Sequence, residues 1–366
     1  MSSRTSLIGS AVIVAIVFIG VTGVVFLTAQ YEPPRIAVYL LEPGFDDYGF
    51  RDQCRHGMDA VQGDISLSYA PFVFASAAEA ETSMKASAAS QYYDLIMGLG
   101  DNLGSAVQNA AQAYPNQKFA MIGAAVDLPN VASATFAVEE AAFLAGVLAA
   151  HLVSDDPYNG RIGVVASFET DPTVGAMVTA FKNGAILGNS SAGFGITLRE
   201  DVYLGSDNNT ELANTTVFDL FTEGGPGAGV SLIFAPVGMS IPGVRAGMLR
   251  ANATFDTWGE DDRMPLVIAA GTNLDYLGLP DPDIPSGESW IPTSVVPRAD
   301  TAIYRIINAT LWNDFEAGVT PYRLANSGVN ITDFQFSTQY IPIPLRQIIK
   351  QVQAEIIAGD IHPLSI

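Results

Sequence analysis

The sequence predicts an α/β protein of two lobes, each a parallel β-sheet flanked by helices, preceded by one N-terminal transmembrane helix. The chain has 366 residues, which exceeds the roughly 250–300 residues at which a single hydrophobic core stops growing. From residue 35 onward, short apolar segments alternate with segments of helical character. This alternation is typical of a parallel sheet covered by helices. A break at Asp155-Asp156-Pro157 separates two such series.

The first element is an uncharged apolar run at residues 7–29. At about 1.5 Å per residue, a helix of this length spans a hydrocarbon layer of about 30 Å. A cleaved signal peptide usually has an apolar core of roughly 7–15 residues and a small-x-small cleavage site, of which Leu27-Thr28-Ala29 is a poor version. We therefore interpret residues 1–30 as a membrane anchor, with a cleaved signal segment as the alternative and a buried core helix as the least favoured.

The first series after the anchor alternates regularly between strands and helices. We expect strands at 35–42, 66–74, 93–100 and 118–125, and helices at 49–61, 77–90 and 105–114. The strands are apolar on both faces, as central parallel strands are. In such sheets, the loops at the carboxyl ends of the strands carry the ligand site.

A long amphipathic stretch at 138–152 leads into the break, and the second series follows it. We expect helices at 138–152, 172–187, 211–222 and 344–359, and strands at 161–168, 196–204, 229–236 and 265–272. The last helix has apolar residues at helical spacing and ends at a glycine cap.

Composition excludes several classes of function. The chain carries 38 acidic and 17 basic residues, a net charge of −21, whereas nucleic acids and anionic lipid surfaces require a basic surface. Cys54 is the single cysteine and the three histidines are scattered, so a disulfide or a Cys/His metal site is not expected. The chain lacks the P-loop, HExxH, GxSxG and CxxC motifs. We expect no enzyme, no cofactor and no metal.

Six Asn-x-Ser/Thr sequons follow the apolar run. The candidate glycosylation sites are Asn189, Asn208, Asn214, Asn252, Asn308 and Asn330. Only Arg4 precedes the run, and a strongly acidic chain follows it, which fits the positive-inside rule. Together these features favour a soluble part outside the cytoplasm.

The segment EPGFDDYGFRDQCRHG at residues 42–57 carries a resemblance to a known family. It resembles the basic membrane protein family, the purine-nucleoside-binding lipoproteins that serve ABC importers. That family has D-D-x-S-F-N-Q after its first strand and a glycine five residues later. Asp46, Asp47, Phe50 and Gly57 keep this spacing, whereas other residues replace the Ser, Asn and Gln. The resemblance continues, in the family's order, at 94–100, 113–123, 130–150, 161–168, 181–185, 235–238, 292–296 and 356–361.

The resemblance implies a type I periplasmic binding protein fold, in which two Rossmann-like lobes close on a ligand around a three-strand hinge. We expect lobe 1 to comprise 35–137 and about 265–297, and lobe 2 to comprise 138–264 and about 298–366. On this interpretation the ring of Phe50 stacks on a base. Asp46 and Asp47 accept hydrogen bonds, and Gly238 allows close backbone approach.

The sequence departs from the family at several implied ligand contacts. Gly123, Gly271 and Asn273 stand where the family has acids. Pro297 stands where it has a lysine, and Arg298 follows one residue later.

Two further departures concern an aromatic side chain and a basic one. Asp207 stands where the family has an aromatic residue in lobe 2, which leaves Phe168 or Tyr203 as a substitute. Arg51 offers a planar fork for a carboxylate or phosphate, or it is a surface arginine paired with Asp47 or Asp52. The family's scaffold is retained, and its pocket is altered.

The predicted function is that of a membrane-anchored, extracytoplasmic solute-binding protein of an ABC importer. Its expected partners are a nucleoside-like small molecule, permease subunits and the membrane around residues 7–29. The alternative is a surface structural or assembly protein that reuses the fold with an idle pocket and assembles with itself.

Overall fold

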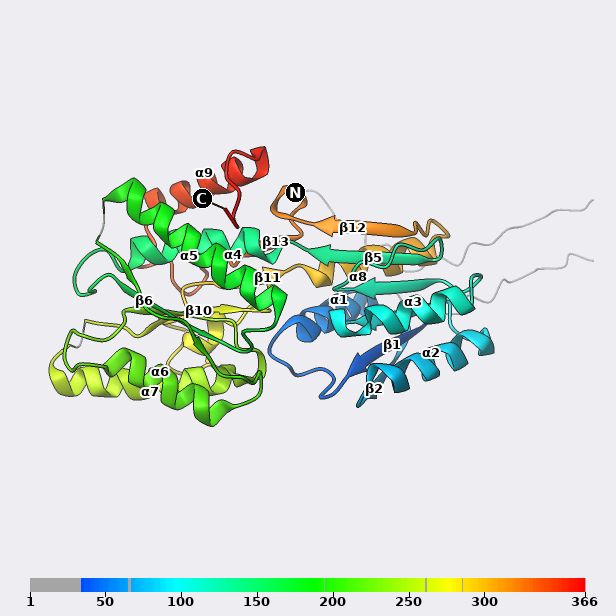
Figure 1. The fold of residues 1–366 in the computed structure, drawn as a ribbon, viewed down its shortest axis with the longest axis horizontal. Coiled ribbons are helices and arrows are strands. Elements are labelled where there is room, and N and C mark those ends of the chain that lie inside the picture. The colour runs from blue at the N-terminus through cyan, green and yellow to red at the C-terminus, as the bar shows by residue number, and fades with distance from the viewer. Residues whose placement is uncertain (1–33, 65–66, 194, 261, 285, 366) are drawn as a thin grey trace, which may run out of the picture.

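The computed structural model describes residues 34–365 except 65–66, 194, 261 and 285, and shows two lobes side by side (Figure 1). Each lobe is built on its own sheet with helices on both sides, which confirms the predicted two-lobed α/β class. The expected transmembrane segment at 7–29 lies outside the described residues. Within the described part, no helix has the length and apolar character needed to cross a membrane.

Lobe 1 contains a six-stranded sheet in the order β12-β5-β4-β3-β1-β2. All of its strand pairs are parallel, so a helix or long connection returns the chain between them. The elements of lobe 1 are β1 (Arg35–Leu41), α1 (Phe50–Asp64), β2 (Ser68–Phe74), α2 (Ala77–Ser90), β3 (Leu95–Leu99), η1 (Asp101–Leu103), α3 (Gly104–Ala113), β4 (Phe119–Ile122), β5 (Val131–Phe136), α8 (Ala299–Leu311) and β12 (Gly318–Tyr322).

Lobe 2 contains a seven-stranded sheet with the path β13-β11-β10-β9-β6-β7, and β8 also pairs with β6. The expected strand at 196–204 is two short strands, each parallel to β6. The elements of lobe 2 are α4 (Val138–Leu152), β6 (Arg161–Ala166), α5 (Pro172–Ala192), β7 (Thr197–Leu198), β8 (Val202–Tyr203), α6 (Thr210–Thr222), β9 (Leu232–Ala235), η2 (Gly238–Ser240), α7 (Ile241–Trp258), β10 (Leu266–Ala270), η3 (Asp275–Gly278), β11 (Ser294–Pro297), η4 (Leu324–Asn326), β13 (Val329–Ile331) and α9 (Ile343–Ala358).

The expected division between the lobes is wrong in the last third of the chain. Residues 265–297 were expected in lobe 1, but β10 pairs with β9 and β11 pairs with β10 in the sheet of lobe 2. In the region from about 298 onward, α8 and β12 belong to lobe 1, because α8 packs against α1 and β12 completes the free edge of β5. The chain therefore crosses between the lobes near residues 137, 298 and 323, and these three crossings form the hinge.

The core of lobe 2 is organised around α4. Its predicted bounds are confirmed, but it is not amphipathic, because most of its side chains on every face are buried. It packs closely on α5 through glycines: a Cβ atom at Gly146 or Gly184 would collide with the backbone of the facing helix. Small residues here allow the two helix backbones to approach, which explains the Ala/Gly-rich composition of this stretch.

Two helix ends of lobe 2 follow from local sequence. The carboxylate of Asp171 accepts hydrogen bonds from the N–H groups of Thr173 and Val174 and caps α5. The predicted glycine cap of the last helix is confirmed, because Gly359 ends α9 with a φ of +82°.

Candidate functional site

A cavity of about 290 Å³ lies between the two lobes, at the carboxyl ends of strands from both sheets. This volume is just below the range for ligand pockets, about 300–1,000 Å³. Lobe 1 contributes Asp47, Gly49, Phe50, Arg51, Gly100, Asp101, Asn102, Gly123 and Phe136. Lobe 2 contributes Val138, Ser167, Asp171, Thr173, Val174, Met177, Asp207, Pro236, Gly238, Met239, Ala270 and Gly271, and Pro297 lies at a hinge crossing.

Half of the sequence-predicted ligand contacts line this cavity. Asp47, Phe50, Arg51 and Gly238 do so. Those that lie elsewhere are Asp46, Phe168, Asn273 and Arg298. The predicted segment after the first strand therefore does reach the cavity, but only part of it lines the wall.

Two of the predicted residues that lie off the cavity wall form ion pairs with other side chains. The side chain of Asp46 is 80% exposed, and its Oδ1 lies 2.6 Å from Nη1 of Arg55. Arg298 forms a two-pronged ion pair with Asp300, with an Nη2–Oδ2 distance of 2.8 Å. Both therefore make contacts within lobe 1 or at the hinge.

Four of the positions at which the sequence departs from the family lie on the cavity wall. Gly123, Asp207, Gly271 and Pro297 all line it, whereas Tyr203, proposed as a substitute aromatic residue, does not. The sequence changes are thus concentrated where they alter the surface that a ligand meets.

Phe50 is the aromatic surface of lobe 1. It is the first residue of α1, and its ring packs edge-to-face on Phe136, with the centroids 5.5 Å apart and the planes at 72°. A Cβ atom at Gly123 would lie 3.4 Å from the Phe50 ring. The glycine therefore leaves space for this ring, where an acidic side chain would crowd it.

Asp47 caps the helix that Phe50 begins. Its carboxylate accepts hydrogen bonds from the N–H groups of Gly49 at 2.9 Å, Arg51 at 3.2 Å and Asp52 at 3.1 Å. Burial raises the pKa of Asp47 above its ordinary value, and these hydrogen bonds and the charge of Arg51 oppose that shift. Much of the carboxylate's hydrogen-bonding capacity is used by the backbone.

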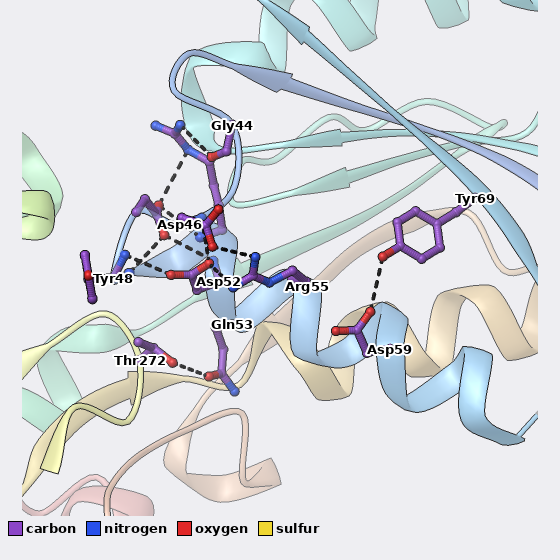
Figure 2. Close-up of polar contacts among 12 residues, drawn as sticks. Gly44, Asp46, Tyr48, Asp52, Gln53, Arg55, Asp59, Tyr69 and Thr272 are labelled. Carbon is purple, nitrogen blue, oxygen red and sulfur yellow. Dashed lines mark hydrogen bonds and ion pairs between the residues drawn. The ribbon is translucent and has the colours of Figure 1, made fainter. Parts of the chain in front are cut away.

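Arg51 ties the loop after β1 to α1. Its Nη1 donates to the carbonyl oxygens of Leu41 at 2.9 Å and Gly44 at 3.1 Å, and its Nε lies 3.6 Å from Oδ2 of Asp47. Figure 2 shows this loop, in which Asp52 also accepts from the N–H groups of Asp46 and Tyr48. These contacts favour the paired interpretation of Arg51 over that of a fork for a ligand carboxylate or phosphate.

Two of the helices that begin at the cavity have aspartate caps, because Asp47 caps α1 and Asp171 caps α5. Asp101, also on the wall, accepts from the N–H of Asn102 at 2.8 Å, whereas α4 and η2 begin there without a side-chain cap. Free N–H groups at a helix start attract anions, whereas a carboxylate already in place repels them. With Asp207 also on the wall, the site favours an uncharged or cationic ligand.

Sequence reasoning missed several residues of the cavity wall. Asp101 and Asp171 follow predicted strands, and Ser167 lies at the end of one, so the rule that ligand loops lie at the carboxyl ends of strands could have found them. Phe136 could not have been found in this way, because no strand is predicted between residues 125 and 138. The structure places β5 there, directly before α4.

Candidate chemistry outside the cavity is limited among the described residues. No group of three or more His, Cys, Asp or Glu side chains there could hold a metal ion. Cys54 is buried in α1, and burial raises the pKa of its thiol well above the ordinary value.

The six sequons occupy different settings. Asn208 lies on an exposed loop before α6. The others lie in regular elements: Asn189 in α5, Asn214 in α6, Asn252 in α7, Asn308 in α8 and Asn330 in β13. Glycosylation at these positions stays a prediction, for which Asn208 has the most accessible backbone.

Comparison with known proteins places these features in context. Residues 35–197 match the family model Bmp, described as ABC transporter substrate-binding protein PnrA-like. The chain is 26% identical over 295 residues to the ABC transporter nucleoside-binding protein BmpA of Lactococcus lactis subsp. cremoris, covering 79% of this chain and 78% of that protein. It is 24% identical over 321 residues to an uncharacterized lipoprotein of Pyrococcus furiosus, covering 87% and 75%.

Solved structures show the same fold. A solute-binding protein of an ABC transporter system from Aeropyrum pernix K1 superposes with a TM-score of 0.73 at 20% identity, covering 90% of this chain and 93% of that chain. Another from Conexibacter woesei has a TM-score of 0.66 at 15% identity, covering 90% and 98%. The expected family resemblance and the two-lobed binding-protein fold are confirmed.

Proposed function

We propose that this chain, whose residues 35–197 match the family model of PnrA-like ABC transporter substrate-binding proteins, captures a nucleoside between its lobes for an ABC importer. The observation that carries the proposal is the cavity between the lobes. It combines the aromatic ring of Phe50 on one lobe with the hydroxyl and carboxylate groups of Ser167, Asp171 and Thr173 on the other.

A nucleoside has the chemistry that these walls complement. Its base is a flat aromatic surface that stacks on a phenyl ring, and its ribose hydroxyls donate hydrogen bonds to carboxylates. Because Asp47 and Asp171 cap α1 and α5, and Arg51 is bonded to backbone carbonyls, these groups offer a phosphate few free donors. The proposal therefore favours nucleosides over nucleotides, and the Lactococcus relative is named a nucleoside-binding protein.

The proposed role is binding and delivery without chemical change of the ligand. Its partners would be the permease subunits of the importer. Three relatives from Pyrococcus species are named lipoproteins, whereas the single cysteine here is buried in α1. We propose that residues 7–29 anchor this chain instead, with the two lobes outside the cytoplasm.

Thermal denaturation with a ligand panel tests the proposal. The panel contains purine and pyrimidine nucleosides, their 5′-monophosphates, free bases and ribose. A ligand at about 100 times its Kd adds about 2.7 kcal/mol to the free energy of unfolding, so a nucleoside should raise the Tm and its monophosphate should not. Chromatography after incubation should recover the nucleoside unchanged. A panel in which no nucleoside raises the Tm contradicts the proposed ligand class.

A further inference from the structure

The two lobes are joined by a buried hydrogen bond beside the cavity. Oγ1 of Thr272, in the loop after β10, donates to Oε1 of Gln53 on α1 at 2.8 Å (Figure 2). The two side chains are 4% and 6% exposed. They lie 219 positions apart in the sequence and on different lobes, and neither lines the cavity.

The backbone around this hydrogen bond brings the lobes into direct contact. A Cβ atom at Gly271 would lie 2.8 Å from Cα of Gly49 on the other lobe. Next to it, the partly buried ring of Tyr48 packs on the hydrophobic core of lobe 2. The Thr272–Gln53 hydrogen bond is therefore shielded from water, which would otherwise compete for both groups.

Gln53 also lies close to Asp300 at the start of α8. Burial raises the pKa of Asp300, but interactions with Arg298 and Gln53 stabilise the carboxylate and bring the pKa below its ordinary value. Arg298, the ion-pair partner of Asp300, lies at a crossing between the lobes. The Thr272–Gln53 hydrogen bond is therefore close to one of the crossings.

We propose that Gln53 and Thr272 form a latch that holds the two lobes together and so sets ligand affinity without touching the ligand. A two-lobed protein binds only as well as its closed state is populated. Separating the lobes would leave the Thr272–Gln53 partners without each other. The effect on affinity depends on the proposed binding function, whereas the effect on lobe separation does not.

The test is the distance between the lobes in Thr272→Val, which removes the hydroxyl and keeps the shape of the side chain. Spin labels at two exposed helix positions, Gln108→Cys on lobe 1 and Asp256→Cys on lobe 2, report this distance by pulsed electron paramagnetic resonance, and Cys54 is buried. We expect a shift toward longer distances in the full chain without added ligand. We also expect about five-fold weaker binding of guanosine, the effect of one buried hydrogen bond.

Two controls separate the latch from general stability. Thr272→Ser keeps the hydroxyl and should retain the wild-type distances. Ser133→Ala removes a buried hydrogen bond to the carbonyl of Val126 within lobe 1, so it should lower the Tm without changing the distances. Wild-type distances in Thr272→Val overturn the latch, whatever happens to affinity. Because the distance measurement needs no ligand, it remains decisive if guanosine does not bind.

Discussion

The loop after β1 in lobe 1 and the loop after β10 in lobe 2 meet at the same cavity and are built in opposite ways. In the first loop, the side chains of Asp47, Arg51 and Asp52 form hydrogen bonds with neighbouring backbone groups of lobe 1. In the second loop, Thr272 bonds to the other lobe. The hydrogen bonds of the first loop thus support Phe50 from within its own lobe. The hydrogen bond of Thr272 instead joins the second loop to the opposite lobe.

The second loop also rests on an acid that is almost completely buried. Asp275 is 1% exposed, and its Oδ1 accepts from Oγ of Ser294 at 2.6 Å. Burial raises its pKa from 3.8 to about 6, although hydrogen bonds from Ser294 and Thr332 oppose the shift. The support of the loop after β10 is therefore sensitive to pH.

The largest expected effect follows from Asp275. Because its folded-state pKa is the higher one, its contribution to stability is fully present below about pH 4 and is lost as the pH rises to about 6. The loss is on the order of 3 kcal/mol. Asp275→Asn should remove this part of the pH dependence, as measured by denaturant unfolding between pH 4 and pH 7. Asp333→Asn, an exposed neighbour, should leave most of it, and an identical slope in wild type and Asp275→Asn would refute the account.

The next effect tests whether Phe50 is the stacking surface for the base. Phe50→Ala should weaken nucleoside binding by about 2 kcal/mol, or about 30-fold in Kd, because the base loses its stacking surface. Phe168→Ala is the matched control, since Phe168 is exposed and lies off the cavity wall. Titration calorimetry measures both, and equal affinities for the two variants would show that the base does not stack on Phe50.

A smaller effect distinguishes the roles of Asp46 and Asp47, the two adjacent acids in the loop after β1. Asp47→Ala removes the cap of α1 and should lower the free energy of unfolding by about 1 kcal/mol, which corresponds to a fall of about 2–4 °C in Tm. Asp46→Asn tolerates the left-handed backbone at φ +66° and removes only the charge of an exposed ion pair with Arg55, which contributes little. The reverse order of the two melting temperatures would contradict the capping role.

The smallest effect concerns Arg51. Arg51→Lys keeps the charge but loses the fork that holds the carbonyls of Leu41 and Gly44. We expect less than about 1 kcal/mol of lost nucleoside affinity and an unchanged preference for nucleoside over monophosphate. A selective loss of monophosphate binding would restore Arg51 as an anion contact.

The sequence predicts local structure well because strand and helix periodicity is local. The helix at 138–152 is found with its bounds. Phe50 and Asp47 are placed at the cavity by the family resemblance of the segment after the first strand. The sheet to which β10 belongs was not predictable, because a strand buried on both faces looks the same in either lobe. The partner of Thr272 was equally hidden, since Gln53 is brought to it only by the meeting of the lobes.

Photoaffinity labelling with an azido-nucleoside tests most directly the central claim that a nucleoside occupies the cavity between the lobes. Under irradiation, 8-azidoguanosine should label peptides that contain Phe50 or the 236–239 segment, and excess guanosine should suppress the labelling. Mass spectrometry of the digested protein locates the adducts. Labelling that guanosine does not suppress, or that falls only on the separate surface hollow lined by residues such as Arg199, Asp219 and Glu223, would contradict it.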